Sequence, residues 1–227
     1  TVHYRQGDSD EDRTAYGEVV LAAIGRVPNT DADWFRSSGL KLDERGYVTV
    51  DGYGRTNLDG VWALGDITPG HALAHRAFEQ GITIAEKIAG ADPKPVIDDT
   101  VPQVVFSFPE AASVGLTLDQ AKAREDVVEP KETAYPMLSN ARMLMSGEGG
   151  SMTVVSGAFA NNPDMQVVLG VHIVSPIASD LIAEAEQLVG NRVPLADAAR
   201  LIHPHPTFSE TLGEALLKAD GRPLHTR

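Results

Sequence analysis

Residues near the C-terminal end of the sequence combine side chains that can move protons. The run from His203 to Thr207 reads His-Pro-His-Pro-Thr, and Glu210 follows it. Each proline disfavours helical backbone at the residue before it and permits a cis peptide bond. A histidine oriented by a carboxylate is the minimal set for acid–base chemistry near neutral pH, so His205 and Glu210 are candidate catalytic residues. The alternative interpretation is a Thr207-x-x-Glu210 capping box that only starts a helix.

A second candidate site lies at Gly65-Asp66. The run 60–66 is almost wholly apolar before this pair, which predicts a buried strand ending there. Ligands of α/β proteins bind outside the carboxyl ends of strands, and the next helix supplies free N–H groups. Asp66 is therefore a candidate acceptor for ligand hydroxyls, with a simple turn cap as the alternative.

Three other patterns predict no chemistry. His71 and His75 have a helical metal-ligand spacing, but no suitably placed carboxylate or thiolate joins them, so we expect no metal site. His172 lies in a predicted strand and is expected to be structural. The segment 147–150 is Gly-Glu-Gly-Gly, which lacks the dinucleotide fingerprint and predicts a turn.

The composition restricts the class of protein. The 227 residues include 32 acidic and 19 basic side chains, a net charge of -13. Without a Lys/Arg cluster, the sequence argues against nucleic acid or anionic membrane as a partner. The absence of Cys excludes disulfides and Cys nucleophiles within this chain. No signal peptide or apolar run of about 18 residues is present, which favours the cytoplasm. The first residue is not Met, so we expect the chain to begin inside a longer one.

The elements that must hold these residues divide at a linker rich in Pro and Asp, residues 90–99. The part before it has α/β character, and its apolar run 18–25 predicts a strand buried on both faces. The predicted elements there are strands at 2–5, 18–25 and 60–66, a hairpin at 42–50 and a helix at 72–89.

The part after the linker has α+β character, with antiparallel strands and helices gathered toward the end. Thr117-x-x-Gln120 predicts a capping box, and residues 161–164 suit a hairpin connection. The predicted strands are 103–108, 152–158 and 166–175, and the predicted helices are 176–189, 195–202 and 208–218.

Five short motifs occur in the order and rough spacing of one enzyme family. On these motifs the chain resembles the flavoprotein disulfide reductases, also called pyridine nucleotide-disulfide oxidoreductases. Within them it is most similar to the dihydrolipoamide dehydrogenase group, the E3 components of 2-oxoacid dehydrogenase complexes. The motifs are Ala-Ile-Gly-Arg-Val-Pro-Asn at 23–29, Arg-Thr at 55–56, Gly-Val-Trp-Ala-Leu-Gly-Asp at 60–66, Ala-Leu-Ala-His at 72–75 and His-Pro-Thr-Phe-Ser-Glu at 205–210.

The resemblance implies two cofactors, FAD and NAD. Asp66 would hydrogen-bond the ribityl chain of FAD. The stretch Ala72-Leu73-Ala74-His75 would open a helix whose backbone N–H groups and dipole face the flavin. Gly25 would lie near bound NAD.

The resemblance also implies a homodimer that serves a 2-oxoacid dehydrogenase complex through its lipoyl substrate. His205 would exchange a proton with the dithiol in the partner subunit's active site, and Glu210 would orient it. The domains would be the tail of the NAD-binding domain (1–26), a central FAD-contacting segment (27–97) and an interface domain (98–227).

The sequence departs from the family pattern in what it lacks. It contains no FAD fingerprint, no redox Cys pair and no NAD fingerprint. We therefore expect the C-terminal portion of such an enzyme, inactive alone and weak in FAD binding. The alternatives are another disulfide reductase, a quinone reductase of the same family, or a dimerisation module without catalysis.

Overall fold

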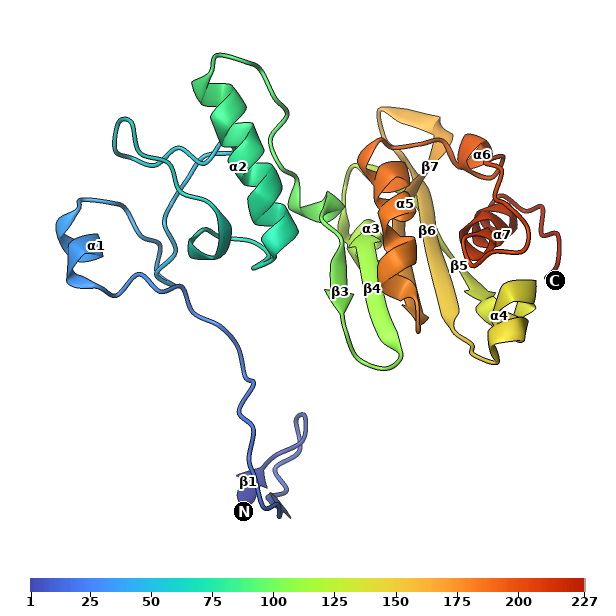
Figure 1. The fold of residues 1–227 in the computed structure, drawn as a ribbon, viewed down its shortest axis with the longest axis horizontal. Helices are drawn as coiled ribbons and strands as arrows, with labels where there is room; N and C mark the ends of the chain where they lie inside the picture. Colours follow the sequence, from blue (N-terminus) through green and yellow to red (C-terminus); the bar gives the residue numbers. More distant parts are fainter. Residues whose placement is uncertain (227) are drawn as a thin grey trace.

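A five-stranded antiparallel sheet organises the second half of the chain in the computed structural model, which describes residues 1–226 (Figure 1). Its strand order is β3-β4-β7-β6-β5, and the long β6–β7 hairpin forms its centre. The α+β character predicted for this half is confirmed. The strands are β3 (Gln103–Val105), β4 (Glu110–Gly115), β5 (Val127–Pro136), β6 (Ser151–Phe159) and β7 (Asn162–Ser175).

Both faces of this sheet are covered, because successive side chains of a strand point to opposite faces. Val154 packs in the larger apolar cluster with helices α5 (Ala178–Gly190) and α7 (Glu210–Ala219). Its neighbour Val155 packs in a smaller cluster with α3 (Leu118–Ala123). Figure 1 shows α5 lying along the sheet and α7 beside β5 and β6.

Polar contacts fix the ends of these helices. Thr117 and Gln120 form the predicted capping box at the start of α3, with both reciprocal hydrogen bonds present. The Ser179 N–H at the start of α5 donates to the Glu110 carboxylate at 2.8 Å. His172, in β7, contacts the Leu116 carbonyl through Nε2 at 3.1 Å. The predicted position of His172 in a strand is thus confirmed.

Several boundaries in this half differ from prediction. Helix α6 (Leu195–Ala198) stops before residue 202, and the chain then runs without helix to α7. Pro204 and Pro206 keep His203 and His205 out of the helical region, so the end of this run forms no helix before α7. β3 ends at residue 105 rather than 108. Gly147 ends α4 (Ala141–Ser146) in a left-handed conformation, as expected for a turn.

The first half is built around α2 (Ala74–Ile88) and a small cluster of buried Phe35, Val48 and Ala63. Around it lie loops, the short helix α1 (Asp33–Ser37) and the 3₁₀ turns η1 (Gly65–Ile67) and η2 (Asp98–Thr100). The helix predicted at 72–89 is confirmed with a later start. The hairpin predicted at 42–50 is reduced to one bridge, between Leu42 and Val48.

Two strands predicted in this half are wrong. Residues 60–66 make one bridge, from Trp62 to Arg55, and end in η1. Residues 18–25 form no strand, and Leu21 and Ile24 are 88% and 99% exposed. A strand needs a neighbour to satisfy its backbone groups, and within residues 1–226 neither run has a sheet to join.

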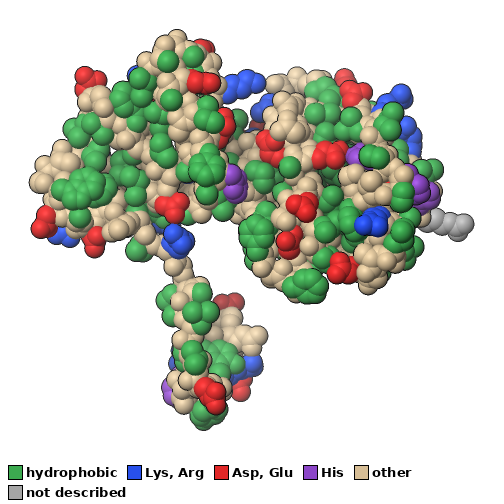
Figure 2. All heavy atoms as spheres, in the orientation of Figure 1, with side chains coloured by type: hydrophobic (Ala, Val, Ile, Leu, Met, Phe, Trp, Pro, Cys, Tyr) green, Lys and Arg blue, Asp and Glu red, His purple; other side chains and the backbone are tan. Residues whose placement is uncertain are grey.

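The two halves form separate lobes, one built around α2 and the other around the five-stranded sheet, and the N-terminal segment stands away from both (Figures 1 and 2). It holds a small hairpin of β1 (Val2–Tyr4) and β2 (Arg13–Ala15), followed by an extended stretch. On the face shown in Figure 2, acidic side chains are scattered over both lobes. Among residues 1–226, no helix has the length and apolarity needed to cross a bilayer.

Candidate active site

The loop between α6 and α7 places His205 against Glu210. The imidazole Nδ1 lies 2.8 Å from Glu210 Oε1, and Glu210 Oε2 accepts the Thr207 backbone N–H at 2.7 Å. The Glu210 side chain is 19% exposed, whereas that of His205 is 68% exposed. The carboxylate is therefore fixed from the protein side while the imidazole projects outward. The His205–Pro206 peptide bond is cis.

The hydrogen bond determines which imidazole nitrogen is available. Burial raises the pKa of Glu210, but the Thr207 N–H and His205 outweigh it and hold that pKa below its usual value. An ionised carboxylate only accepts, so Nδ1 of His205 carries the proton of this bond. Nε2 is then free to accept a proton from a ligand, which is the arrangement of a general base.

Thr207 does not cap the next helix, so that half of the predicted capping box is wrong. Ser209 occupies the N-cap position, and no side chain caps the helix there. The Thr207 hydroxyl instead donates to the Pro204 carbonyl at 2.6 Å. Because Glu210 is the first residue of α7, Thr207 lies too early to reach the first turn. The Glu210 carboxylate accepts hydrogen bonds from both the Thr207 N–H and His205.

Two residues that the sequence did not single out hold this loop in place. His203 Nε2 lies 2.8 Å from Glu184 on α5, and this bond raises the pKa of His203 above its ordinary value. Asn140, the buried N-cap of α4, donates to the Thr207 carbonyl at 3.1 Å. Of these contacts, only the N-cap role of Asn140 has a signal in the sequence, because Asn is a preferred N-cap residue.

A small cavity of about 150 Å³ lies beside the pair. Two further titratable residues, Glu214 of α7 and His225 of the segment after it, line this cavity and were not predicted from the sequence. Its lining consists of Ser139, Asn140, Ala141, Leu144, His205, Glu210, Glu214 and His225.

The second candidate site lies in the other lobe, at η1 and the start of α2. Asp66 pairs with Arg26 at 3.2 Å, and both side chains are exposed. Leu73 is the N-cap of α2 and offers no side-chain cap, and the first turn carries no acidic residue. The backbone N–H groups of that turn and the positive end of the helix dipole are thus available to an anionic or acceptor group.

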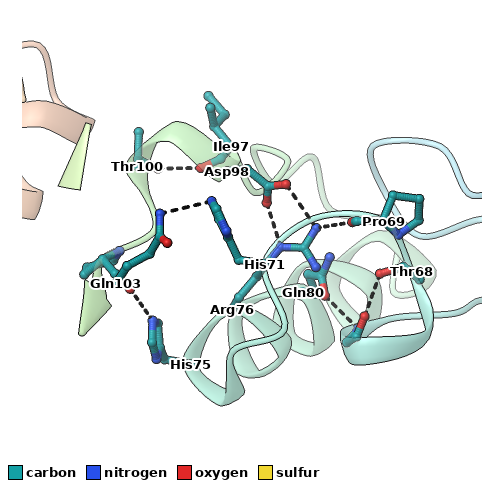
Figure 3. A network of polar contacts seen from close by, with 12 residues as sticks. Thr68, Pro69, His71, His75, Arg76, Gln80, Ile97, Asp98, Thr100 and Gln103 are labelled. Carbon is teal, nitrogen blue, oxygen red and sulfur yellow. Dashed lines mark hydrogen bonds and ion pairs between the residues drawn. The ribbon is translucent and has the colours of Figure 1, made fainter. Parts of the chain in front are cut away.

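The two histidines near this helix start have separate partners (Figure 3). His75 contacts the Pro102 carbonyl at 2.7 Å, and His71 lies 3.3 Å from the Gln103 amide. Arg76 joins the helix to Asp98 at 2.6 Å and to the Pro69 carbonyl at 2.7 Å. Within the part of the chain that the structure describes, no group of three or more His, Asp or Glu could hold a metal ion.

The chain does not bring its two candidate sites together. The α2 helix and α7 lie in different lobes, on opposite sides of the sheet in Figure 1. Gly25 lies in the exposed N-terminal stretch, with φ of 141°. A site that used all the predicted residues would need more protein than one copy of this chain.

Family comparisons cover most of the chain. The model described as "Pyridine nucleotide-disulphide oxidoreductase, dimerisation domain" matches residues 101–216. The model described as "Pyridine nucleotide-disulphide oxidoreductase" matches residues 3–81. The boundary between the two matches falls near the predicted linker.

Individual relatives are consistent with this. A dihydrolipoyl dehydrogenase of Cupriavidus necator is 40% identical over 227 residues, which is 99% of this chain and 46% of the relative. One from Geobacillus stearothermophilus is 39% identical, over 95% of this chain and 44% of the relative. The chain therefore spans about half the length of the curated relatives it matches.

Solved structures share the fold. LpdA from Mycobacterium tuberculosis has a TM-score of 0.77 and 31% identity, covering 87% of this chain and 42% of that one. The disulfide reductase RclA from Escherichia coli, at 24% identity and a TM-score of 0.73, supports the fold alone; the match covers 86% of this chain and 43% of that one. The sequence, the antiparallel sheet and these matches agree that the chain belongs to the pyridine nucleotide-disulphide oxidoreductase family.

Proposed function

We propose that the chain is the C-terminal portion of a dihydrolipoamide dehydrogenase, which converts dihydrolipoamide and NAD⁺ to lipoamide and NADH. The observation that carries this proposal is the His205–Glu210 pair, with its 2.8 Å bond and its exposed imidazole. A dithiol substrate needs such a base, because the thiolate rather than the thiol is the nucleophile. The names of the relatives support the same substrate.

His205 acts as the acid–base of thiol–disulfide exchange. Its Nε2 takes the proton from a substrate S–H as that sulfur attacks the redox disulfide, which lies outside this sequence. A new S–S bond to the substrate forms as the disulfide breaks and releases a Cys thiolate, and the resulting imidazolium faces the Glu210 carboxylate. The same nitrogen later returns the proton to a departing thiolate. Glu210 orients the ring and stabilises the imidazolium, and general acid–base groups of this kind contribute about 10²–10⁴-fold.

The α2 lobe fits the flavin that the family implies. The start of α2, at the stretch Ala72-Leu73-Ala74-His75, has uncapped N–H groups and no acidic side chain. Asp66 is exposed and held only by a surface ion pair with Arg26, which costs little to exchange for a ribityl hydroxyl. Bound FAD supplies the electron transfer between NAD and the dithiol. Gly25 would lie beside NAD, and the redox cysteines must come from outside this sequence, which has none.

We further propose that residues 98–227 form the interface domain of a homodimer, with 27–97 as the central segment and 1–26 as the tail of the NAD domain. Exposed apolar side chains beside the edge strand β3 support this, with Phe106 and Phe108 78% and 82% exposed. His205 then serves the active site of the partner subunit. The enzyme works in the cytoplasm on the lipoyl group of a 2-oxoacid dehydrogenase complex.

The substrate is tested with the intact enzyme, purified with its flavin. NADH formation from dihydrolipoamide is compared with NADH-dependent reduction of glutathione-type disulfides and of quinones. The proposal predicts that dihydrolipoamide is the preferred substrate by orders of magnitude in kcat/KM. Faster turnover of a quinone or of another disulfide would replace it with the corresponding reductase.

The isolated 227-residue chain tests the alternative of a dimerisation module. Its flavin absorbance and its mass in solution are measured together. A colourless dimer means that this chain alone only pairs, which agrees with its lack of cysteine. A monomer would contradict the assignment of residues 98–227 to the interface.

A further inference from the structure

A second imidazole–carboxylate pair lies one helical turn from the first. Glu214 follows Glu210 by four residues on α7, so both carboxylates project from one face of the helix. Glu214 Oε1 lies 2.7 Å from Nδ1 of His225, and Oε2 accepts the His225 backbone N–H at 3.2 Å. Both Glu214 bonds therefore hold the segment that follows α7.

The two pairs share one cavity. His205, Glu210, Glu214 and His225 all line the space of about 150 Å³ beside α4. Glu214 is only 7% exposed, although its partner imidazole is 61% exposed. A carboxylate less exposed than its partner imidazole thus occurs in both pairs, with Glu210 19% exposed against 68% for His205.

A buried hydroxyl lies within electrostatic range of both carboxylates. Tyr135 of β5 is fully buried, and its OH has no hydrogen-bond partner in the described structure. Burial first, and then the charges of Glu214 and Glu210, raise the pKa of Tyr135 to about 12. This hydroxyl is a donor that stays protonated near the paired negative charges.

We propose that Glu214 and His225 are positioning residues for the His205–Glu210 pair. The Glu214 carboxylate places a second negative charge behind Glu210, which strengthens the bond that Glu210 accepts from the catalytic imidazole. His225 hydrogen-bonds that carboxylate through Nδ1 and its backbone N–H and lines the cavity from the C-terminal segment. The catalytic meaning of this arrangement rests on the proposed function, but the coupling between the two pairs does not.

Other charged groups near the pair come from every element packed around it. His203 lies on the α5 side, where Glu184 and, more weakly, Glu210 act on it. On the α4 side, the Arg142 guanidinium lies 5.2 Å from the centre of the Phe208 ring. These groups stay the same in the variants below, so they do not confuse the comparison.

The coupling is tested by NMR on the 227-residue chain with labelled histidine. Glu214→Gln keeps the shape of the side chain and removes its charge, and His225→Gln removes the imidazole that hydrogen-bonds the Glu214 carboxylate. The proposal predicts opposite changes in the His205 Nδ1–H resonance: an upfield shift in E214Q, as the bond to Glu210 weakens, and a downfield shift in H225Q. Glu125→Gln, an exposed loop residue between α3 and β5, is the matched charge control.

The intact enzyme gives the second readout. The acid limb of the kcat/KM pH profile should move to lower pH by roughly half a unit in E214Q and to higher pH in H225Q, less than the 1–3 units typical of a directly paired charge. Shifts in the same direction in both variants, or shifts no larger than those of E125Q, would overturn the proposal. If E214Q does not fold, the direction of the shift in H225Q decides alone. The NMR signal needs no turnover, so failure of the proposed function is seen separately.

Discussion

The packing of Gly213 against His203 gives a sharp prediction about the loop that carries His205. A Cβ added at Gly213 on α7 would lie 2.5 Å from Nδ1 and 2.9 Å from Cε1 of His203. Such contacts are too short to persist. The His203 side chain is only 9% exposed, so its ring cannot move aside without leaving Glu184.

The expected change in stability is a difference between two effects. Alanine is favoured over glycine in a helix by about 1 kcal/mol. Losing the His203–Glu184 bond, which is to a charged group, costs about 1.5–3 kcal/mol, and the lower end applies because Glu184 is 37% exposed. Gly213→Ala should therefore lower the free energy of unfolding by roughly 0.5 kcal/mol, despite improving helix propensity.

The assay is urea unfolding of the chain followed by circular dichroism. Gly81→Ala in α2 is the matched control, because a Cβ there meets nothing within 4 Å; it should be stabilising. In a His203→Ala background, Gly213→Ala should also become stabilising, since the ring is gone. If G213A is as stable as G81A in the presence of His203, the described packing of this loop is wrong.

Three further predictions concern stability and use the same unfolding measurement. The pKa of His203 is raised on folding, so its contribution to the free energy of unfolding is full below about pH 6.5 and is lost as pH rises through the folded pKa. The destabilisation caused by His203→Asn should therefore shrink between pH 6 and pH 9. A destabilisation that grows with pH would contradict a raised pKa. Thr117→Ala removes one half of the capping box of α3 and should cost about 1 kcal/mol, whereas no loss would mean the cap is not formed. Asp98→Asn leaves the buried Arg76 guanidinium without its ion partner; because Asp98 is 40% exposed, the cost should be about 1–3 kcal/mol, and a neutral effect would mean that the linker is not joined to α2 in this way.

Part of the second half was predictable because some of its patterns contain their own partners, whereas β4, β5 and α4 were not predicted. The strands at 152–158 and 166–175 pair with each other as β6 and β7, and the helix at 176–189 covers them as α5. Thr117 and Gln120 interact over three residues, so the sequence alone specifies their capping box. Short-range patterns of this kind do not depend on distant segments.

The first half was less predictable for the opposite reason. The apolar run 18–25 has the composition of a buried strand, yet Leu21 is almost fully exposed. Apolar composition indicates that a segment would suit a buried sheet. A strand forms only where neighbouring strands pair with its backbone, and the hydrophobic pattern of one segment does not show whether such neighbours are present. Residues 60–66 fail in the same way and end in a 3₁₀ turn.

The candidate site shows the same division between local and distant information. His205 and Glu210 are five residues apart, and their contact follows from the motif. The contact of His203 with Glu184 spans 19 residues, and that of Asn140 with Thr207 spans 67. Such partners depend on how α5 and α4 pack around the loop, which only the folded chain shows.

The role of His205 as the acid–base of thiol–disulfide exchange can be measured by rapid-mixing kinetics of the intact enzyme carrying His205→Gln. Two half-reactions are measured through the flavin absorbance: reduction by dihydrolipoamide and reduction by NADH. If His205 is the acid–base, the dihydrolipoamide reaction slows by about 10²–10⁴-fold while the NADH reaction is nearly unchanged. An unchanged dihydrolipoamide reaction, or an equal loss in both, would contradict that role.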